Sequence, residues 1–516
     1  MTVFKNEGYA DYSTKEAFDK QKNAINEVNN NLGKEYPNII NGNEVFTEKK
    51  TISINPGNTD EVIGIFQKSG KDDAEKAIQA AAEAFETWKY VPAEERAAYF
   101  FKAADIVRKR KTEIIAWMIK EEGKNYLEAD ADCSEGIDFL ELYAREGLRY
   151  SQKQPVTPWP GEENEYFYIP LGVGIVIPPW NFPFAIMLGM TTAAIVSGNT
   201  VVLKPSSDAP MMAWLFVDIM RELGLPKGVL NFLVASGGEA GDYLVEHPKT
   251  RFISFTGSMD VGLRINELAA KKSPGQIWIK RVIAEMGGKD SIIVDNEADI
   301  DEAAKGVAVA AFGFQGQKCS ACSRAIVDAK VYDEFVKKLK VEVEKFQIGL
   351  PEDNFYSGPV INEKAEKSIL NYIEIGKKEG KLILGGEKAP GLKGFYIKPT
   401  VIIDIDPMAT ISQEEIFGPV LAVIKANDYD HALQIANNTQ YGLTGAVFTK
   451  NEDKLNRAVK EFHVGNLYLN RKCTGAMVDV QPFGGYNMSG TCSKAGSRDY
   501  LALFTQGKSV AKKIIK

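Results

Sequence analysis

The sequence predicts an α/β protein in which two doubly wound domains, each built on a parallel sheet, follow one another along the chain. From residue 172 onward, short apolar segments typical of buried strands alternate with longer segments typical of helices. Such alternation indicates parallel sheets covered by helices. The chain has 516 residues, 44% of them hydrophobic and 25% charged, which suffices for two or three domains with cores of their own. A disordered or fibrous protein is therefore excluded.

The first third of the chain is predicted to be mainly helical. Residues 1–35 are expected to be helical, followed by short strands at residues 36–42 and 51–66 with a turn at residues 56–58. Amphipathic helices are then expected over residues 73–88, 92–110, 112–122 and 127–151. This part of the chain shows no nucleotide-binding loop.

Two strand–helix alternations follow. In the first, strands are predicted at residues 172–177, 200–203, 230–234 and 252–255, and helices at residues 184–196, 209–223, 239–246 and 259–271. The second runs from residue 291 to about residue 481, with strands near Ile292, Ala325, Val401, Val420, Gly445 and Leu467. Residues 151–170, which are rich in proline, and the tail after Tyr500 are predicted to lie outside both sheets.

Composition and charge narrow the class of protein. The net charge is −7 and the isoelectric point about 5.5, which argues against nucleic acid or an anionic membrane as the main partner. The uncharged run at residues 166–203 is broken by prolines into segments too short to cross about 30 Å of hydrocarbon, so it is interpreted as buried core. The N-terminus lacks the apolar core of a secretion signal.

The cysteines predict a reducing compartment, and we expect a cytoplasmic protein. They number five, an odd count, and are scattered along the chain at positions 133, 319, 322, 473 and 492, unlike a disulfide framework. Cys319 and Cys322 form a lone CxxC pair without a second pair or a histidine cluster, so no metal site is predicted.

The stretch at residues 313–320 presents Cys319 on a polar, glycine-punctuated turn, and we interpret this cysteine as a nucleophile. The preceding helix has Asp299 as its predicted N-cap and Glu302 as the capping-box partner, and a strand follows. Residues on such connections are often functional. The alternative is a small core hydrophobe, but the neighbours of Cys319 are polar. Lys318 can help to stabilise a thiolate.

The expected base is a carboxylate rather than a histidine. The chain has three histidines, His247, His431 and His463, and each stands in a setting typical of a surface or helix-terminal residue. A Cys/His hydrolase is therefore disfavoured. Glu285 follows an apolar stretch and precedes two glycines. At the end of a buried strand its pKa would be raised by desolvation, which suits a general base.

Seven motifs, in order and spanning nearly the whole chain, resemble the aldehyde dehydrogenase superfamily. They are PPWNFPF at residues 178–184, LKPSS at 203–207, FTGSMDVG at 255–262, EMGGK at 285–289, GQKCS at 316–320, EEIFGP at 414–419 and PFGG at 482–485. Two further stretches, LNRKCTGA at 469–476 and SGTCSKAGSRDYL at 489–501, resemble the 1-pyrroline-5-carboxylate (L-glutamate γ-semialdehyde) dehydrogenases within that superfamily.

The resemblance implies three parts of the fold. A Rossmann-type NAD(P)-binding domain would comprise residues 1–150 and 171–286, and an α/β catalytic domain residues 287–482. Residues 151–170 and 483–516 would form a small β flap and C-terminal tail for oligomerisation, as a dimer or a multiple of dimers.

The resemblance also assigns the cofactor site. Gly257 and Ser258, in a strand–turn–helix segment, can offer backbone N–H groups to a pyrophosphate, although a simple turn and cap is the alternative reading. Lys204 resembles the contact to the adenosine ribose, and Ser207 occupies the position where members that prefer NAD often carry a carboxylate. NAD is the expected cofactor, and NADP stays open. The remaining predicted contacts are Glu415 and Phe417 at the nicotinamide ribose and ring, with Pro179 and Trp180.

The implied chemistry is thioester catalysis. Cys319 adds to the aldehyde carbon, and the side chain of Asn181 with the N–H of Cys319 stabilises the alkoxide. Loss of hydride to the nicotinamide leaves a thioester, and Glu285 activates the water that hydrolyses it. The alternative interpretation of Asn181 is a structural one, a turn residue between prolines.

The narrower resemblance implies oxidation of L-glutamate γ-semialdehyde to L-glutamate in proline breakdown. The substrate carboxylate would be held by the N–H groups of Gly496 and Ser497 and by the Ser320 hydroxyl. Phe184 and Phe504 would pack against the aliphatic middle of the substrate, with ordinary core packing as the alternative for each.

Three rival interpretations remain at this point. One is an aldehyde dehydrogenase for another small carboxylated aldehyde such as succinate semialdehyde. Another is acyl transfer to coenzyme A, which needs no water-activating carboxylate such as Glu285. The third is a non-catalytic binding protein with the same fold, against which Cys319, Glu285, Asn181 and Lys204 argue together.

Overall fold

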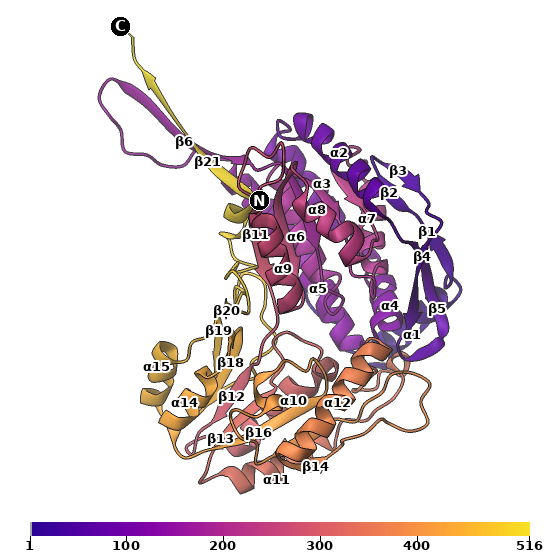
Figure 1. Ribbon diagram of the computed structural model, residues 1–516, viewed down its shortest axis with the longest axis vertical. Helices are drawn as coiled ribbons and strands as arrows, with labels where there is room; N and C mark the ends of the chain where they lie inside the picture. Colours follow the sequence, from indigo (N-terminus) through magenta and orange to yellow (C-terminus); the bar gives the residue numbers. More distant parts are fainter. Residues whose placement is uncertain (1–2, 516) are drawn as a thin grey trace.

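The computed structural model describes residues 3–515. It has two lobes, the upper one drawn in indigo to magenta and the lower one in orange to yellow in Figure 1. A two-stranded ribbon projects from the upper lobe and carries the C-terminal end of the chain. Each lobe contains one seven-stranded sheet. The predicted α/β fold with two mainly parallel sheets is therefore confirmed.

The sheet of the upper lobe has the strand order β11-β10-β7-β8-β9-β2-β3. Its strands are β7 (Val173–Ile177), β8 (Thr200–Leu203), β9 (Leu230–Phe232), β10 (Thr250–Thr256) and β11 (Arg281–Glu285), all parallel, with β2 (Asn38–Ile40) and β3 (Asn43–Val45) added antiparallel at one edge. The chain order reverses between β7 and β10. In an open α/β sheet this is the point where a ligand crevice forms at the carboxyl ends of the strands.

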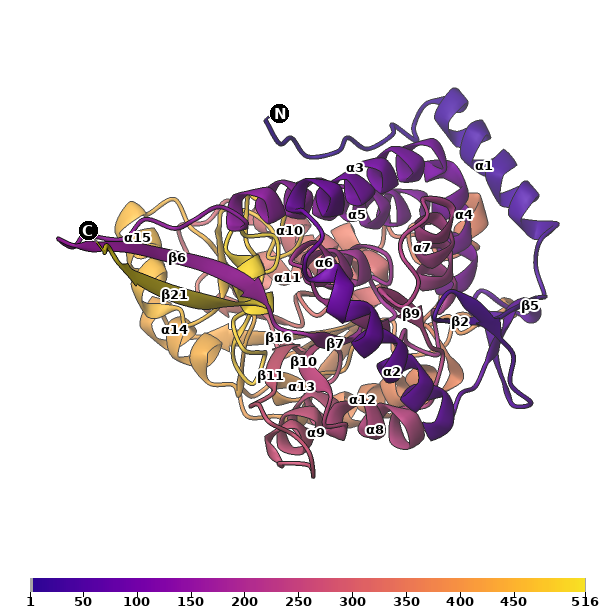
Figure 2. The same ribbon diagram turned by 90° about the horizontal axis from the view of Figure 1, so that it is seen from above.

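Helices cover both faces of this sheet, as Figure 2 shows from above. One face packs against α3 (Ala93–Lys109), α4 (Lys111–Glu122), α5 (Tyr126–Tyr150), α6 (Ala185–Val196) and α7 (Met211–Glu222), and the other against α2 (Lys71–Trp88), α8 (Asp242–Glu246) and α9 (Met259–Ala270). A single turn of π-helix, Gly237–Gly241, precedes α8. Successive residues of β7 enter opposite cores, with Ile175 on the α2 side and Val176 on the α5 side, as the two-residue period of a strand requires.

The N-terminal prediction was wrong in part. Only α1 (Lys15–Asn29) is helical within the predicted residues 1–35. The segment before it is extended along α5. The Asn6 side chain and the Glu7 N–H donate to Asp138 (2.9 and 2.7 Å), and the Ala10 N–H donates to Asp130 (2.8 Å). These contacts between distant parts of the chain replace the local hydrogen bonds of a helix.

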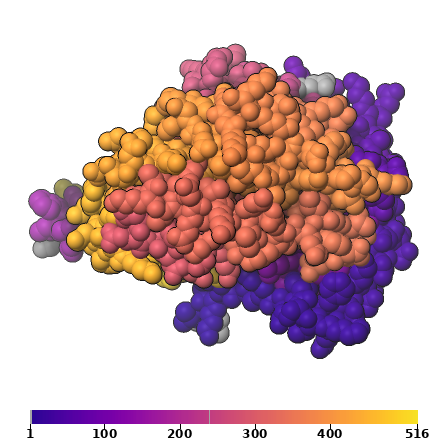
Figure 3. Space-filling model, turned by 90° about the horizontal axis from the view of Figure 1, so that it is seen from below, coloured from indigo at the N-terminus to yellow at the C-terminus, as the bar shows by residue number. Residues whose placement is uncertain are grey.

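The sheet of the lower lobe has the order β14-β15-β16-β13-β12-β18-β19. Its strands are β12 (Ser291–Val294), β13 (Arg324–Asp328), β15 (Thr400–Ile403), β16 (Val420–Ala426), β18 (Thr444–Phe448) and β19 (Asn466–Leu469), all parallel, and β14 (Lys381–Leu384), which is antiparallel. All six predicted strands are present. Seen from below in the space-filling view, this lobe covers most of the visible face (Figure 3).

Helices also cover both faces of the lower sheet. α10 (Ile300–Phe312) and α11 (Tyr332–Val343) pack on one face, and α12 (Glu363–Glu379), α14 (Tyr429–Asn437) and α15 (Glu452–Glu461) on the other, with the short α13 (Thr410–Gln413) nearby. Asp299 caps α10 as predicted, because its side chain accepts a hydrogen bond from the Glu302 N–H (3.3 Å). Helix α10 therefore has a fixed start, and it leads directly to the Cys319 turn.

Three small sheets complete the fold. β1 (Lys34–Tyr36), β5 (Asn58–Gln67) and β4 (Lys50–Asn55) form one, and β17 (Tyr441–Gly442) with β20 (Tyr486–Asn487) another. The third is the ribbon, in which β6 (Glu162–Pro170) pairs antiparallel with β21 (Thr505–Lys513) over nine residue pairs. Short 3₁₀ turns lie at Gly313–Gly316, Pro351–Asp353 and Tyr500–Phe504. The two excursions predicted to lie outside the main sheets thus pair with each other.

Candidate active site

The predicted site residues gather at the junction of the two lobes. The loops after β7, β10 and β11 of the upper sheet meet the loops before β12, β13 and β16 of the lower sheet, because parallel strands present like ends at one edge. The Asn181 Nδ2 atom donates to the Gln317 carbonyl (3.0 Å), and the Gly288 N–H donates to Glu415 Oε1 (3.0 Å). A Cβ added at Gly288 would lie 2.6 Å from the Cys319 carbonyl oxygen, so only glycine allows this approach.

Cys319 follows a strained turn. Phe314 and Gln315, in the 3₁₀ turn after α10, both have left-handed backbone angles (φ 49° and 54°). Non-glycine residues rarely adopt this conformation, and it often occurs at functional sites. The Ser320 N–H donates to the Cys319 thiol. The position of Cys319 is therefore constrained by the strained turn before it and by the hydrogen bond from Ser320 after it.

The environment of Cys319 is acidic and dry. Burial, followed by the negative charges of Asp290, Glu415 and Glu285, raises the pKa of the Cys319 thiol well above its usual range. The hydrogen bond from the Ser320 N–H acts in the opposite direction but is the smaller effect. Without a ligand, the thiol is therefore protonated at neutral pH.

Lys318 does not stabilise the thiolate, contrary to the prediction. Its ammonium forms an ion pair with Glu128 of α5, with Nζ–O distances of 2.7 and 2.9 Å. The lysine is half-buried and its charge is neutralised by this carboxylate, so it does not lower the pKa of Cys319. The adjacent position in the sequence was a misleading signal.

The predicted oxyanion donors lie close together. Asn181 is 4% exposed and reaches the turn before Cys319 through its bond to Gln317. That bond uses one of the two amide hydrogens of Asn181, so the second is available for a ligand. Among residues 3–515, no acceptor is found for the Cys319 N–H. The side chain and the backbone N–H can therefore donate to one oxygen atom.

Glu285 stands at the end of β11, as predicted, and is buried. Burial raises its pKa to about 7. Three donors oppose this shift: the Ser493 hydroxyl and N–H bind Oε1 (2.6 and 3.1 Å), and the Gly485 N–H binds Oε2 (3.2 Å). A carboxylate with a pKa near neutrality can take a proton and release it again at physiological pH.

The predicted phosphate and ribose contacts surround the crevice of the upper sheet. Gly257 and Ser258 lie between β10 and α9, and the Ser258 side chain makes no capping hydrogen bond. The first N–H groups of α9 are therefore open to an anion. Lys204, at the end of β8, is 6% exposed, and burial lowers its pKa to about 8. Within residues 3–515 its ammonium has no hydrogen-bond partner, whereas Ser207 beyond it is exposed and neutral.

The predicted nicotinamide contacts also lie together. The rings of Trp180 and Phe417 meet edge to face with centroids 5.4 Å apart. Phe417 has a left-handed backbone (φ 55°), and Glu415 is held by the Gly288 N–H. Burial raises the pKa of Glu415 to about 7. Pro179 is buried beside Trp180.

The predicted substrate anchor at Gly496 and Ser497 is not available. The Gly496 N–H donates to the Tyr143 hydroxyl (2.7 Å), and the Ser497 N–H donates to the Lys494 carbonyl (3.0 Å). Both groups are thus already satisfied inside the protein. Ser320 differs, because its hydroxyl has no partner among the described residues and it follows Cys319 directly.

The two predicted substrate phenylalanines are core residues. Phe184 is fully buried against Gly136 of α5, and Phe504 is fully buried against Phe252. Phe252 lies toward the start of β10, away from the carboxyl end where the crevice opens. The alternative of ordinary core packing therefore describes both. Phe182, next to Asn181, is partly exposed, and the centroid of its ring lies 4.8 Å from the Lys124 ammonium. The sequence predicted no role for Phe182, although it stands beside Asn181 in the same motif.

The loop that actually adjoins Ser320 is residues 471–476. The Cys473 thiol donates to the Ser320 carbonyl (3.4 Å). In the described residues, the N–H groups of Gly475 and Ala476 have no acceptor. Lys472 folds over Gly475, since its Nζ lies 3.9 Å from a Cβ added there. This loop was noticed only as a family motif, and nothing local in its sequence distinguishes it from the loop at Gly496.

Lys472 carries a positive charge in this loop and interacts with Glu128 only at a distance. Among residues 3–515 no carboxylate lies within 4.0 Å of its ammonium. Lys318, which also interacts with Lys472, is paired with Glu128. Burial, followed by repulsion from Lys318, lowers the pKa of Lys472. An anionic ligand group at Gly475 and Ala476 would therefore meet two N–H donors and the cations of Lys472 and Arg471. The Nη2 atom of Arg471 lies 3.8 Å from a Cβ added at Gly475 and donates to the Thr474 and Gly475 carbonyls.

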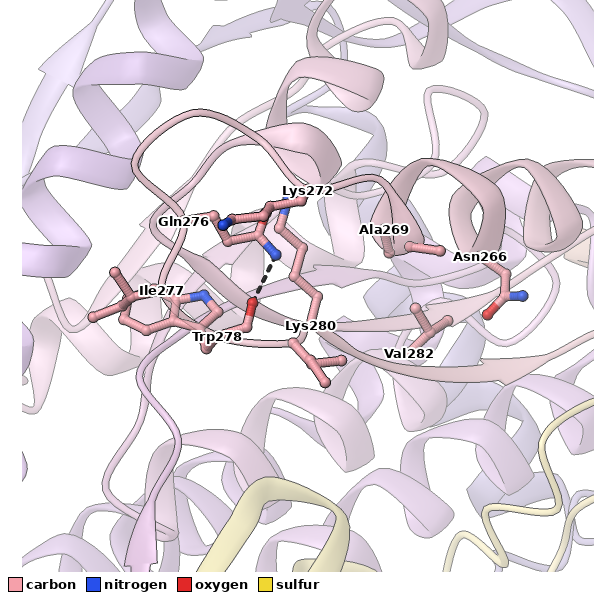
Figure 4. Close-up of a pocket in the computed structure, with 10 residues that line it drawn as sticks. Asn266, Ala269, Lys272, Gln276, Ile277, Trp278, Lys280 and Val282 are labelled. Atoms are coloured by element: carbon pink, nitrogen blue, oxygen red, sulfur yellow. Dashed lines mark hydrogen bonds between the residues drawn. The ribbon is translucent and has the colours of Figure 1, made fainter.

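A cavity of about 680 Å³ on the upper lobe is separate from this site. Figure 4 shows it bordered by Asn266 and Ala269 of α9, Val282 of β11 and the loop between these elements. Ile277 and Ile279 on that loop are 85% and 89% exposed. None of the predicted site residues lines the cavity. In residues 3–515, no helix has the length and apolar character that a membrane crossing requires.

Known proteins are similar to this chain over nearly its whole length. The model of the aldehyde dehydrogenase family matches residues 45–510. A protein of Geobacillus thermodenitrificans named 1-pyrroline-5-carboxylate dehydrogenase is 57% identical over 98% of this chain and 99% of its own length. One of the same name from Bacillus subtilis is 54% identical, over 99% of both chains.

Solved structures extend the comparison. The chain is similar to 1-pyrroline-5-carboxylate dehydrogenase from Thermus with bound NAD, with a TM-score of 0.98 and 49% identity over 100% of both chains. A betaine aldehyde dehydrogenase from Staphylococcus aureus in complex with NAD⁺ gives a TM-score of 0.89 at 29% identity, over 96% of this chain and 97% of that one.

Proposed function

The chain belongs to the aldehyde dehydrogenase family, and on this premise we propose that it oxidises L-glutamate γ-semialdehyde to L-glutamate with NAD. The aldehyde is the open form of 1-pyrroline-5-carboxylate, the compound in the names of the relatives, and the reaction belongs to proline degradation. The observation that carries the proposal is the junction where the Cys319 thiol, the Asn181 amide and the buried Glu285 carboxylate gather on a chain similar to those relatives over its full length.

The residues at the upper crevice suit NAD. An open helix N-terminus at Gly257 and Ser258 fits a pyrophosphate, and the buried, unpartnered ammonium of Lys204 fits a ribose hydroxyl. Glu415 and Phe417 would hold the nicotinamide end. When bound, NAD supplies the acceptor for the hydride that oxidises the substrate. Ser207 places no negative charge near the ribose, so we propose that NADP is also accepted.

The substrate carboxylate is proposed to bind at the loop 471–476. The N–H groups of Gly475 and Ala476 and the hydroxyl of Ser320 provide donors, and Lys472 provides a positive charge. Hydrogen bonds to a charged group are among the stronger ones in proteins. This arrangement selects an aldehyde with an anionic group at its far end.

Acylation begins at Cys319. Its sulfur bonds to the aldehyde carbon, the thiol proton passes to a water molecule and so to the solvent, and the carbonyl oxygen becomes an alkoxide that accepts hydrogen bonds from Asn181 Nδ2 and the Cys319 N–H. Loss of hydride from the same carbon leaves a thioester on Cys319. Because the donors are already in place, they need little reorganisation when the charge develops.

Hydrolysis is assigned to Glu285. Its carboxylate takes a proton from water, the water oxygen bonds to the acyl carbon, and the carbon–sulfur bond breaks to release L-glutamate and the Cys319 thiol. An enzyme that passed its acyl group to coenzyme A would not need this base. The presence of Glu285 therefore supports hydrolysis rather than acyl transfer.

We also propose that the protein forms homo-oligomers through the ribbon of β6 and β21. The ribbon projects from the body (Figure 1), and its outer edges leave backbone groups for pairing with another strand, except at Tyr166, whose carbonyl accepts from the Gln154 N–H (2.8 Å). Removal of residues 505–515 should lower the molar mass measured by light scattering.

The upper lobe is proposed as the cofactor domain (1–150 and 171–286), and residues 287–482 as the catalytic domain. Five free cysteines support a cytoplasmic location.

A panel of aldehydes assayed with NAD and with NADP tests the proposed function. Glutamate semialdehyde should give the highest kcat/KM, above succinate semialdehyde and an uncharged aldehyde of equal length, with production of one NADH per L-glutamate. Lack of NADH formation with every aldehyde would refute the activity, and preference for the uncharged aldehyde would refute the substrate.

A further inference from the structure

One segment near the C-terminus surrounds the general base. Residues 485–493 provide all three hydrogen bonds that the carboxylate of Glu285 receives within the described residues: two from Ser493 and one from Gly485. The two carboxylate oxygens of Glu285 differ in the hydrogen bonds that they accept. Oε1 accepts two bonds, one of them at 2.6 Å, whereas Oε2 accepts a single longer bond of 3.2 Å.

This segment is joined to β11, which ends in Glu285. The Met286 N–H donates to the Ser489 carbonyl (2.8 Å), and the Thr491 N–H donates to the Ala284 carbonyl (2.9 Å). Glu285 and Gly490 thus form an antiparallel bridge. Short strand pairing therefore fixes the distance between the loop and the carboxylate.

The backbone around Ser493 is bent to turn this residue inward. Cys492 and Lys494, on either side, both have left-handed angles (φ 55° and 51°). Cys492 is exposed, but Ser493 is 6% exposed. The Lys494 ammonium holds the bend by donating to the carbonyls of Gly465 (2.6 Å) and Gly484 (2.9 Å). Strained residues on both sides of one position are retained only where the surroundings enforce them.

We propose that Ser493 is a positioning residue for thioester hydrolysis, which holds Oε1 of Glu285 with its hydroxyl and N–H and leaves Oε2 to take the proton from water. The inference rests on the proposed role of Glu285. The hydroxyl also favours the charged form of the carboxylate, because a donor stabilises an anion more than a neutral acid. Removing it makes the carboxyl a weaker acid, so less base is present at neutral pH.

Other titratable groups face the carboxylate without bonding to it. Lys494 interacts with it electrostatically from the same loop, as do Cys319 across the site and Tyr500 from the C-terminal 3₁₀ turn. Lys494 and Cys319 are unchanged in a Ser493 variant. A change in pH dependence can then be assigned to the lost hydroxyl.

The test is the pH dependence of turnover in Ser493→Ala, with Ser493→Thr as the conservative variant and Cys492→Ser as the matched control. Stopped-flow measurements separate the first NADH burst from the steady state. In Ser493→Ala we expect an unchanged burst, a midpoint of the steady-state profile raised by about one pH unit, and turnover at pH 7 lowered several-fold with recovery near pH 9. Ser493→Thr restores the wild-type midpoint, and Cys492→Ser leaves it in place.

Two results would overturn the inference: an unchanged midpoint in Ser493→Ala, or a Ser493→Thr enzyme that behaves like the alanine variant. If Ser493→Ala does not fold, Ser493→Cys carries the test, since its weaker donor should give an intermediate midpoint. Failure of the proposed function itself looks different, because the wild-type enzyme would then give no burst with any aldehyde.

Discussion

Replacing Lys472 by methionine removes one positive charge beside the proposed carboxylate site while keeping the approximate length of the side chain, and Arg471 retains its charge there. The ammonium lies 3.9 Å from a Cβ added at Gly475, so a carboxylate on the neighbouring N–H groups would lie roughly 5 Å away. At an effective dielectric constant of 20, two unit charges at that distance interact by about 3 kcal/mol. Exposed pairs contribute at most about 1 kcal/mol.

Lys472 is half-buried, so the loss should fall between these limits. About 1.4 kcal/mol corresponds to a tenfold lower kcat/KM for glutamate semialdehyde. An uncharged aldehyde of equal length should be affected by less than about twofold. Lys472→Arg should retain most of the preference, and Lys460→Met, at an exposed position on α15, should have no effect on either substrate.

Ionic strength provides an independent check. Raising the salt concentration to about 1 M shortens the screening length to roughly 3 Å. The wild-type enzyme should then lose part of its preference for the charged aldehyde, whereas Lys472→Met should lose less, because only Arg471 still attracts the carboxylate there. Equal losses on both aldehydes in Lys472→Met, or a salt response as large in the variant as in the wild-type enzyme, would refute the assignment of Lys472 to the substrate carboxylate.

Four further predictions concern the chemistry and the cofactor. Glu285→Gln should give an NADH burst of about one equivalent followed by turnover lowered by about 10²–10⁴, since the thioester forms before water is needed; unchanged steady-state turnover would assign the base elsewhere. Cys319→Ala should abolish NADH formation while NAD binding measured by calorimetry persists, and Cys322→Ala should stay active; turnover without Cys319 would exclude it as the nucleophile. In the unliganded enzyme, alkylation of Cys319 should be slow at pH 7 and rise steeply above pH 9, because its raised pKa keeps the thiol protonated; rapid alkylation at pH 7 would contradict the described surroundings. Ser207→Glu should shift the ratio of kcat/KM toward NAD by about threefold, a modest effect because the position is exposed and screened, and an unmoved ratio would place the ribose elsewhere.

The sheets were predictable because each strand is a short apolar run bounded by polar or glycine residues. Residues 200–203 and 324–327 illustrate this, as both fall within observed strands. The extended segment before α1 was not predictable, because its hydrogen bonds go to Asp130 and Asp138 more than a hundred positions away. A local pattern does not contain such partners.

The candidate site, like the fold, could be predicted from the sequence only in part. Cys319 and Glu285 were identified from their immediate neighbours, and the structure brings both to the lobe junction. The substrate loop was misassigned, because two glycine-containing loops look alike until their hydrogen bonds are known. Tyr143, at the Gly496 N–H, decides between them. Lys318 misled for a related reason: adjacency along the chain does not give the direction of a side chain, and Glu128 takes its charge.

The pairing of β6 with β21 has a consequence for synthesis on the ribosome. Pro170 and Thr505, which pair at the base of the ribbon, are about 335 residues apart in the chain. At about 5–20 residues per second, translation needs roughly 17–70 seconds to cover that distance. During this interval β6 is a nascent strand with two open edges, and its glutamates at positions 162, 163 and 165 repel the same segment on neighbouring chains of a polysome. Charge thus protects β6 from premature association until its own partner strand has been made.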